Sequence, residues 1–268
     1  MAVDVRRGFH HDLDLVRDDL VRLAGMVSEA LARGTEALLN GDLTVAEELI
    51  NGDDRLDALA VDIEERCYSL LALQQPVAVD LRALVAAARM CSEIERSGDL
   101  VVNMMKAARR LYGTSIDPKL RGLIARLATE VGRLFRLAMD AYADRNEGLA
   151  AALDDMDDAV DTLHAEYIAA IFECHDRKAI PLQAAVQMAL VGRYYERIGD
   201  HAVNIGERVR YICTGWLPEH AGVARVAASG EPTRTPLTSG QRLRDVDGST
   251  EANGSAGSAD EPPPPAGS

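Results

Sequence analysis

The sequence predicts an all-α protein of two pseudo-symmetric antiparallel three-helix bundles, with six long helices, followed by a disordered C-terminal tail. Hydrophobic residues make up 47% of the chain but aromatic residues only 4%. An apolar content built from Ala, Leu and Val favours helices over sheets. Apolar residues recur at helical spacing over long segments, and no segment alternates with period 2. A nine-residue pattern also occurs twice, which indicates an internal repeat.

The first two helices are predicted over residues 9–39 and 43–73. In the first, apolar residues follow helical spacing from Phe9 to Leu38. Asn40-Gly41-Asp42 then combines a helix stop with an N-cap for the next helix. Gly52 is a weak point within the second helix, and Pro76 ends it, because proline disfavours the helical conformation of the preceding residue.

Four more helices are predicted after Pro76, over residues 78–112, 118–145, 147–175 and 180–214. Asp117 is a suitable N-cap, and it is followed by proline at the first helical position. Short connections between long helices favour antiparallel packing of neighbours.

The predicted helices divide the chain into three parts. Residues 1–113 form a first three-helix bundle and residues 114–217 a second. Residues 218–268 are rich in Gly, Ser, Pro, Asp and Glu and end in four consecutive prolines and Ala-Gly-Ser. Such a composition buries too little apolar surface to fold, so we expect this tail to be disordered.

Charge and apolar patterning exclude several classes of protein. The net charge of −14 argues against nucleic-acid binding, which needs a basic surface. Charged residues interrupt the N-terminal segment, so it lacks the apolar core of a signal peptide. No stretch of the sequence approaches the ~18 apolar residues that a membrane span needs. The four cysteines are widely separated and lack zinc spacing, so we expect free thiols and a cytoplasmic protein without direct membrane insertion.

The repeated pattern runs from Glu95 to Asn103 and returns 101 positions later, from Glu196 to Asn204. Its Glu and Asp are four residues apart, so they share one face of a helix. A helical projection places Glu95 and Asp99 within about 40° of apolar residues. A carboxylate in such a stripe requires a cation, hydrogen bonds or a proton.

The second helix of each half supplies a further acidic pair with the same spacing. Together the pairs bring four carboxylates into each half, and a multivalent cation such as Mg²⁺, Mn²⁺, Ca²⁺ or iron suits such oxygen ligands. The sequence therefore predicts metal ligands at Asp53, Asp57, Glu95, Asp99, Asp157, Asp161, Glu196 and Asp200.

Three other interpretations of the acidic pairs stay open. The pairs can be solvated helix faces, or a polar seam that sets helix register without metal. They can also belong to a ferritin-like, carboxylate-bridged metal-binding or redox bundle. Asp161-x-x-His164 resembles the acid-x-x-His element of such bundles, but it occurs once and with Asp in place of Glu.

The duplicated pattern resembles the paired signatures of the PhoU family, and Gln74-Gln75-Pro76-Val77-Ala78-Val79-Asp80-Leu81-Arg82 resembles the family's segment before its third helix. The resemblance spans about residues 8–216. It implies two three-helix bundles and a non-enzymatic protein that restrains phosphate uptake and phosphate-starvation signalling. It further implies contacts with the ATPase of a phosphate ABC transporter and with a phosphate-sensing histidine kinase, homodimers, and bound iron, zinc or other divalent ions, including Mg²⁺ or Mn²⁺.

Two departures from the family pattern bear on these implications. The second half has Pro181-Leu182-Gln183 where the first has Asp80-Leu81-Arg82, so only the first half carries that element. Asp also replaces Glu at the first position of two acidic pairs, at Asp53 and Asp157. Its shorter side chain would hold a metal ion nearer the backbone.

Overall fold

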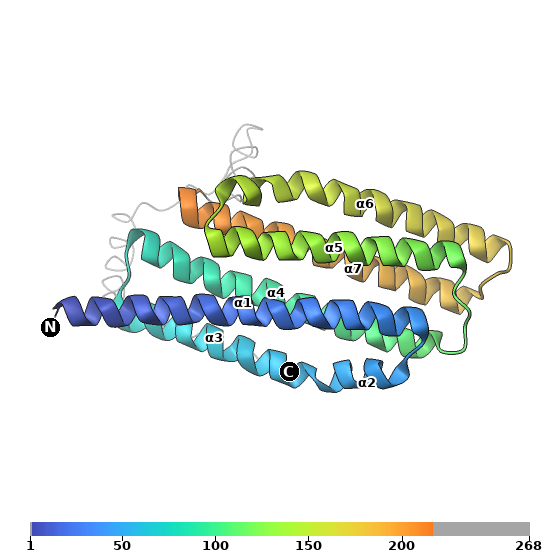
Figure 1. Cartoon of the computed structure of the whole chain (residues 1–268), viewed down its shortest axis with the longest axis horizontal. Coiled ribbons are helices and arrows are strands. Elements are labelled where there is room, and N and C mark those ends of the chain that lie inside the picture. Colours follow the sequence, from blue (N-terminus) through green and yellow to red (C-terminus); the bar gives the residue numbers. More distant parts are fainter. Residues whose placement is uncertain (1, 217–268) are drawn as a thin grey trace, which may run out of the picture. The chain divides into compact units, whose positions relative to one another are not determined.

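The computed structural model describes residues 2–216, which form helices joined by short connections (Figure 1). No strand occurs within these residues, which confirms the predicted all-α class. The predicted tail lies outside them. The helices are α1 (Ala2–Asn40), α2 (Leu43–Asn51), α3 (Asp53–Gln74), α4 (Ala78–Leu111), α5 (Pro118–Asp144), α6 (Glu147–Asp176) and α7 (Leu182–Thr214).

All six predicted helices are present, but the second is divided into α2 and α3 at Gly52. The Gly52 N–H still donates to the Glu48 carbonyl at 2.9 Å, and its φ of −83° is ordinary. Its ψ of −8° lies at the edge of the helical region, and the next bond, from Arg55 N–H to the Gly52 carbonyl, spans only three residues. Glycine is a poor helix former, so the weak point in the sequence is where the helix bends.

The predicted helix boundaries are confirmed at three connections. Gly41 has a φ of +67°, and the Asp42 side chain accepts hydrogen bonds from the backbone N–H groups of the first turn of α2. Gln75 closes α3 in the left-handed conformation, directly before Pro76. Asp117 caps α5 by accepting from Lys119 N–H at 2.8 Å.

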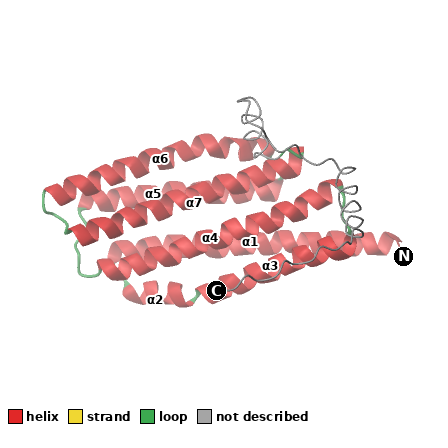
Figure 2. Cartoon of the chain, turned by 180° about the vertical axis from the view of Figure 1, so that it is seen from behind, coloured by secondary structure: helices red, strands yellow, loops and turns green. Residues whose placement is uncertain are grey.

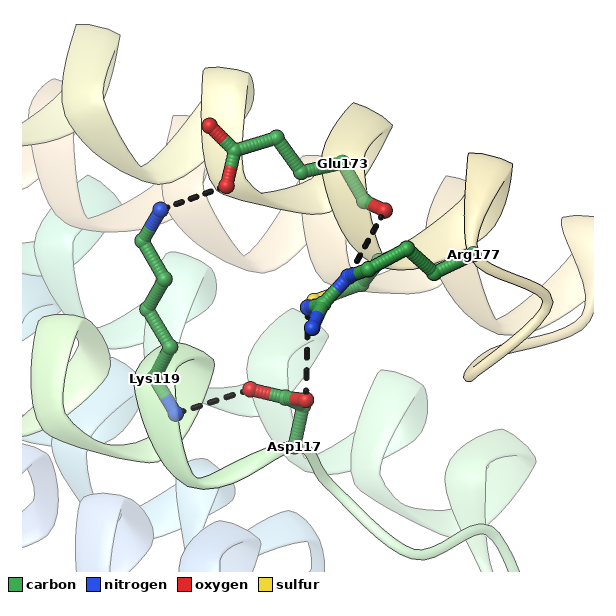
Figure 3. A network of polar contacts seen from close by, with 5 residues as sticks. Asp117, Lys119, Glu173 and Arg177 are labelled. Atoms are coloured by element: carbon green, nitrogen blue, oxygen red, sulfur yellow. Dashed lines mark hydrogen bonds and ion pairs between the residues drawn. The ribbon is translucent and has the colours of Figure 1, made fainter.

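Charged side chains join the start of α5 to the end of α6 (Figure 3). Lys119 Nζ lies 2.5 Å from Glu173 Oε2, and this hydrogen bond and the lysine charge lower the pKa of Glu173. Arg177 reaches the Asp117 carboxylate at 3.7 Å and donates to the Glu173 carbonyl at 3.2 Å. The Lys119–Glu173 pair is exposed to solvent, so we expect it to contribute little to stability.

The two halves meet where α4 packs along α7. Figures 1 and 2 show α1 to α4 on one side of this contact and α5 to α7 on the other. Within the halves, α4 packs against α1 and α3, and α7 against α5 and α6. The described residues form one compact unit, and a shared apolar core runs through all their helices. The division into bundles 1–113 and 114–217 as separate domains stays a prediction.

Three of the cysteines, Cys67, Cys91 and Cys174, are buried, and Cys213 is exposed. All four are free thiols, as predicted. Burial raises the pKa of Cys67 to about 11 and that of Cys91 to about 12, so both remain protonated at neutral pH. None of the described helices has the length and apolarity needed to span a membrane.

Candidate functional site

The first predicted cluster forms where α3 lies against α4. Burial raises the pKa of Asp53 to about 6, with further contributions from the charges of Asp57 and Asp99. The pKa of Asp57 is raised by burial and by Asp99, and that of Glu95 by burial, Asp99 and Asp57. The four carboxylates thus interact, as the sequence predicts.

The second predicted cluster forms at the matching position between α6 and α7. Burial raises the pKa of Asp157 to about 6, and the charges of Asp161 and Asp200 raise it further. Glu196 forms an ion pair with Arg193, one turn earlier in α7. The two halves therefore present comparable acidic clusters, but only the second has this arginine.

Each acidic pair has one half-buried and one exposed member. Asp53, Glu95, Asp157 and Glu196 are half-buried, and their partners four residues later are exposed. The helical projection placed both members of the α4 pair beside apolar residues, and the structure puts the first member nearer the core. The clusters consequently lie at the edge of the helix interface, in contact with solvent.

The glycine of the repeated pattern explains how closely these helices approach. A Cβ on Gly199 would lie 2.7 Å from Asp157 Oδ1, and a Cβ on Gly98 would lie 2.9 Å from Leu56 Cδ1. A larger residue at either position would have to displace the side chain of Asp157 or Leu56. The small residues that the sequence places on these faces therefore bring the acidic pairs of neighbouring helices together.

The second half of the chain contains buried polar side-chain atoms without a hydrogen-bond partner, two of them in the second cluster. Within the described residues these atoms are Asp157 Oδ1, Glu196 Oε2, His164 Nε2 and the Tyr167 hydroxyl, and all belong to α6 and α7. An unsatisfied buried polar atom costs about 1–3 kcal/mol. Burial and the charge of Arg193 lower the pKa of His164, which favours the neutral imidazole.

The chemistry of both clusters fits a hard cation, because carboxylates with raised pKa values regain their charge when a cation lies beside them. The unpartnered oxygens of Asp157 and Glu196 also suit such a ligand. However, no three His, Cys, Asp or Glu side chains within residues 8–216 are arranged to hold a metal ion. The predicted ligands are therefore neighbours, while metal binding by them stays a prediction.

A buried polar network that the sequence did not reveal joins the two copies of the repeated pattern. Ser97 Oγ of α4 lies 3.0 Å from His201 Nδ1 of α7, and Asn204 Nδ2 donates to Glu93 Oε2 at 3.2 Å. His201 Nε2 lies 3.9 Å from the Glu93 carboxylate. The Asn of the second copy thus bonds across the interface between the halves.

Part of this network could have been found in the sequence. Ser97 and His201 stand where the other copy has the apolar residues Ile198 and Leu100. A polar residue that replaces an apolar one in a buried repeat position requires a partner. Their distance from each other in the sequence, however, conceals that they are mutual partners, because only the packing of α4 on α7 brings them together.

Comparisons with known proteins agree with the fold and the duplication. The model of the PhoU domain matches residues 20–108 and 124–209. Phosphate-specific transport system accessory protein PhoU homolog 1 of Mycobacterium leprae and homolog 2 of Mycobacterium tuberculosis are each 34% identical to this chain. Each alignment covers 80% of this chain, and the alignments cover 96% and 100% of these relatives, respectively.

Solved structures show the same architecture. The crystal structure of PhoU from Pseudomonas aeruginosa matches with a TM-score of 0.72 and 27% identity, over 78% of this chain and 100% of that one. The phosphate transport system regulatory protein PhoU from Streptococcus pneumoniae has the same fold, with a TM-score of 0.72, 24% identity and coverage of 78% and 98%. With both halves matched by the family's domain model and the relatives covered almost completely, the chain belongs to the PhoU family.

Proposed function

We propose that this chain is a negative regulator of phosphate uptake and phosphate-starvation signalling. It acts in the cytoplasm without catalysis, through contacts with the ATPase of a phosphate ABC transporter, with a phosphate-sensing histidine kinase, or with both. The observation that carries the proposal is the match to accessory proteins of the phosphate-specific transport system, which extends over 96% or more of their length. An alignment of that extent includes both helical repeats and both acidic clusters.

The geometry supports a binding protein. Long helices present extended surfaces, and several large apolar side chains on them are exposed, among them Tyr68, Phe172 and Leu182. Exposed apolar surface near charged groups is typical of protein–protein contacts. A homodimer is part of the proposal, because the same surfaces are available to a second copy.

Deletion of the gene tests the regulatory role. We expect the deletion strain to take up phosphate and express starvation genes in high phosphate, and the wild-type gene to restore repression. Unchanged uptake and expression, in a strain without a second family member, would contradict the proposal. Pull-down from phosphate-replete cells should recover the transporter ATPase or the histidine kinase.

We also propose that the two acidic clusters bind metal ions. Titration of the metal-free protein with Mn²⁺, Mg²⁺, Fe²⁺ or Zn²⁺ should raise its Tm, because a ligand that binds only the folded state stabilises it. Glu196→Gln should weaken the response, whereas Glu173→Gln, in an exposed ion pair far along α6, should leave it unchanged. A Tm that is indifferent to these ions and to chelator would instead favour a polar seam without metal.

The ferritin-like alternative draws support from one observation, the unpartnered His164 Nε2 beside the second cluster. It predicts tightly bound iron and oxygen consumption by the reduced, iron-loaded protein. Metal analysis together with an oxygen electrode separates the two proposals. Bound iron without oxygen consumption would support the regulatory proposal over the ferritin-like one.

A further inference from the structure

A cavity lies where the two halves meet at one end of the helices. The N-terminal parts of α1 and α4 and the C-terminal ends of α5 and α7 surround it, and Figure 1 shows these four helix ends together. Its volume is about 180 Å³. An engineered protein cavity of about 150 Å³ holds benzene, so this one has room for a small molecule. The polar side chains that line it include Asp14, Arg17, Asp80, Tyr142 and Arg145.

Tyr142 is the most deeply buried polar residue of the cavity wall. Its side chain is only 8% exposed and makes no hydrogen bond to another residue in the described part of the chain. Burial raises the pKa of Tyr142, while the charges of Arg17 and Arg145 act to lower it, so both guanidinium groups lie near the phenol. A buried hydroxyl usually has a hydrogen-bond partner, and a ligand in the cavity would provide one.

The charged groups of the wall retain unused hydrogen-bonding capacity. Arg17 donates to the Ala143 carbonyl at the end of α5, which leaves other N–H groups of its guanidinium available. The side chain of Arg145 forms no ion pair or hydrogen bond with another residue of 2–216, and Asp14 and Asp80 form no ion pair there either. The cavity thus offers donors from two cations and acceptors from two carboxylates.

Asp80-Leu81-Arg82, the element that only the first half carries, lies at this cavity. Asp80 is in its wall, and Arg82 Nε donates to the Ile212 carbonyl of α7 at 3.4 Å. A Cβ on Gly215 would lie 3.4 Å from Arg82 Nη1, so the guanidinium packs closely against the end of α7. Because a helix C-terminus repels anions, a guanidinium bound to its carbonyls makes the adjacent cavity more favourable for an anion.

The opposite end of the molecule shows which of these groups the fold itself requires. Arg121 occupies the position of Arg17 in the other half, and it likewise donates to a carbonyl at a helix end, that of Leu39. The fold therefore uses this arginine contact at both ends. The polar groups of the wall have no such counterparts, because the positions of Tyr142, Arg145 and Asp80 are taken in the other half by Leu38, Gly41 and Pro181.

The mixture of charges indicates the kind of ligand. Arginine binds phosphate and carboxylate groups through paired hydrogen bonds. The carboxylates of Asp14 and Asp80 would repel an anion that has no proton to donate, because an ionised carboxylate only accepts hydrogen bonds. Hydrogen phosphate carries a hydroxyl at neutral pH, whereas sulfate is fully deprotonated. Guanidinium and carboxylate groups in one cavity therefore suit phosphate better than sulfate.

We propose that this cavity binds inorganic phosphate as hydrogen phosphate. Arg17, Arg145 and Tyr142 donate hydrogen bonds to its oxygens, and Asp80 accepts one from its hydroxyl. The ligand then touches both halves of the chain, α1 and α4 from the first and α5 from the second, so its binding stabilises their packing at this end. The inference rests on the proposed function only in the choice of phosphate among small anions that carry a hydroxyl.

Calorimetry tests the site. The full chain is titrated with inorganic phosphate and, separately, with sulfate at pH 7.5, with chelator present so that metal ions at the acidic clusters do not contribute. We expect the Kd for phosphate to be at least tenfold lower than that for sulfate. Phosphate should also raise the Tm more than sulfate does at equal concentration and ionic strength.

Variants locate the binding. Arg145→Gln should raise the Kd for phosphate at least tenfold, whereas Arg133→Gln, the same charge change at an exposed position of α5, should alter it less than twofold. Tyr142→Phe keeps the buried ring and should raise the Kd at least threefold. Asp80→Asn should reduce the preference for phosphate over sulfate to less than threefold, an effect that a purely structural role of Asp80 would not produce. A Tm close to that of the wild type without ligand checks the folding of each variant.

Several results would overturn the inference. These are the absence of phosphate binding at millimolar concentration, equal binding of phosphate and sulfate, and equal effects of Arg145→Gln and Arg133→Gln. Phosphate binding that appears only after Mn²⁺ is added would assign the anion to the acidic clusters instead of the cavity.

The deletion strain separates this inference from the proposed function. If the deletion has no phenotype while calorimetry gives the expected order of Kd values, the regulatory role fails and the phosphate site stands. If the deletion releases phosphate uptake and starvation genes from repression while the purified chain binds no phosphate, the site fails and the regulatory role stands. If Arg145→Gln loses both phosphate binding and the ability to restore repression, both are supported.

Discussion

Replacing Asp157 by Asn should stabilise the protein at neutral pH and not in acid. Asp157 is half-buried, one of its oxygens has no hydrogen-bond partner, and Asp161 and Asp200 add like charge beside it. These surroundings disfavour the carboxylate and raise its pKa from 3.8 to about 6. Asn has nearly the same shape but no charge, so it removes this cost.

The magnitude follows from the pKa shift. A shift of about two pKa units corresponds to at most about 3 kcal/mol for a fully buried group. Because Asp157 is only half-buried, solvent screens much of this energy. We therefore expect the charged carboxylate to lower the free energy of unfolding by about 1 kcal/mol. The unfolded carboxyl titrates near its ordinary pKa and the folded one near 6. The free energy of unfolding of the wild type therefore falls by about 1 kcal/mol as the pH rises from about 4 to about 7.

Urea unfolding at several pH values, with chelator present, measures the effect. The stability of Asp157→Asn minus that of the wild type should be near zero at pH 4 and reach about +1 kcal/mol at pH 7.5. Asp53→Asn, the equivalent change in the first half, should behave alike, because burial also raises the pKa of Asp53 to about 6.

An exposed neighbour provides the control. Asp158→Asn removes a charge one residue away without removing a half-buried carboxylate, so its pH-dependent gain should be smaller. A gain for Asp157→Asn that is the same at pH 4 and pH 7.5 would refute the electrostatic reasoning. So would a loss at pH 7.5, which would mean that the Asp157 carboxylate is stabilised by a cation that chelator does not remove.

Four further changes test packing, helix propensity, capping and the buried hydrogen bond, each by urea unfolding. Gly192→Ala should destabilise by about 1–2 kcal/mol, because a Cβ there meets a buried ring at 2.7 Å, while Gly25→Ala, with open space around it, should stabilise by about 0.5–1 kcal/mol. Asp42→Ala should cost about 1 kcal/mol through the lost cap of α2. Ser97→Ala should cost about 1–2 kcal/mol, because it leaves His201 Nδ1 without its partner; a cost below 0.5 kcal/mol would contradict that role.

Helix content and helix boundaries were predictable because they depend on local interactions. The N-caps Asp42 and Asp117, the stop at Gly41 and the ending before Pro76 each act within a few residues of their position. The bend at Gly52 was visible as a weak point, but the choice between a bend and a continuous helix depends on packing of α2 and α3 against α4.

The sequence by itself also determined which carboxylates would be neighbours, because a four-residue spacing on adjacent antiparallel helices leaves few other arrangements. Only the tertiary structure decided how deeply each is buried, and it left one oxygen of Asp157 and one of Glu196 unpartnered. It also joined Ser97 to His201, 104 residues away. Such contacts depend on the relative rotation of two packed helices. A small rotation decides whether a polar side chain at the edge of an interface contacts solvent, bonds to a neighbouring side chain, or is buried without a partner.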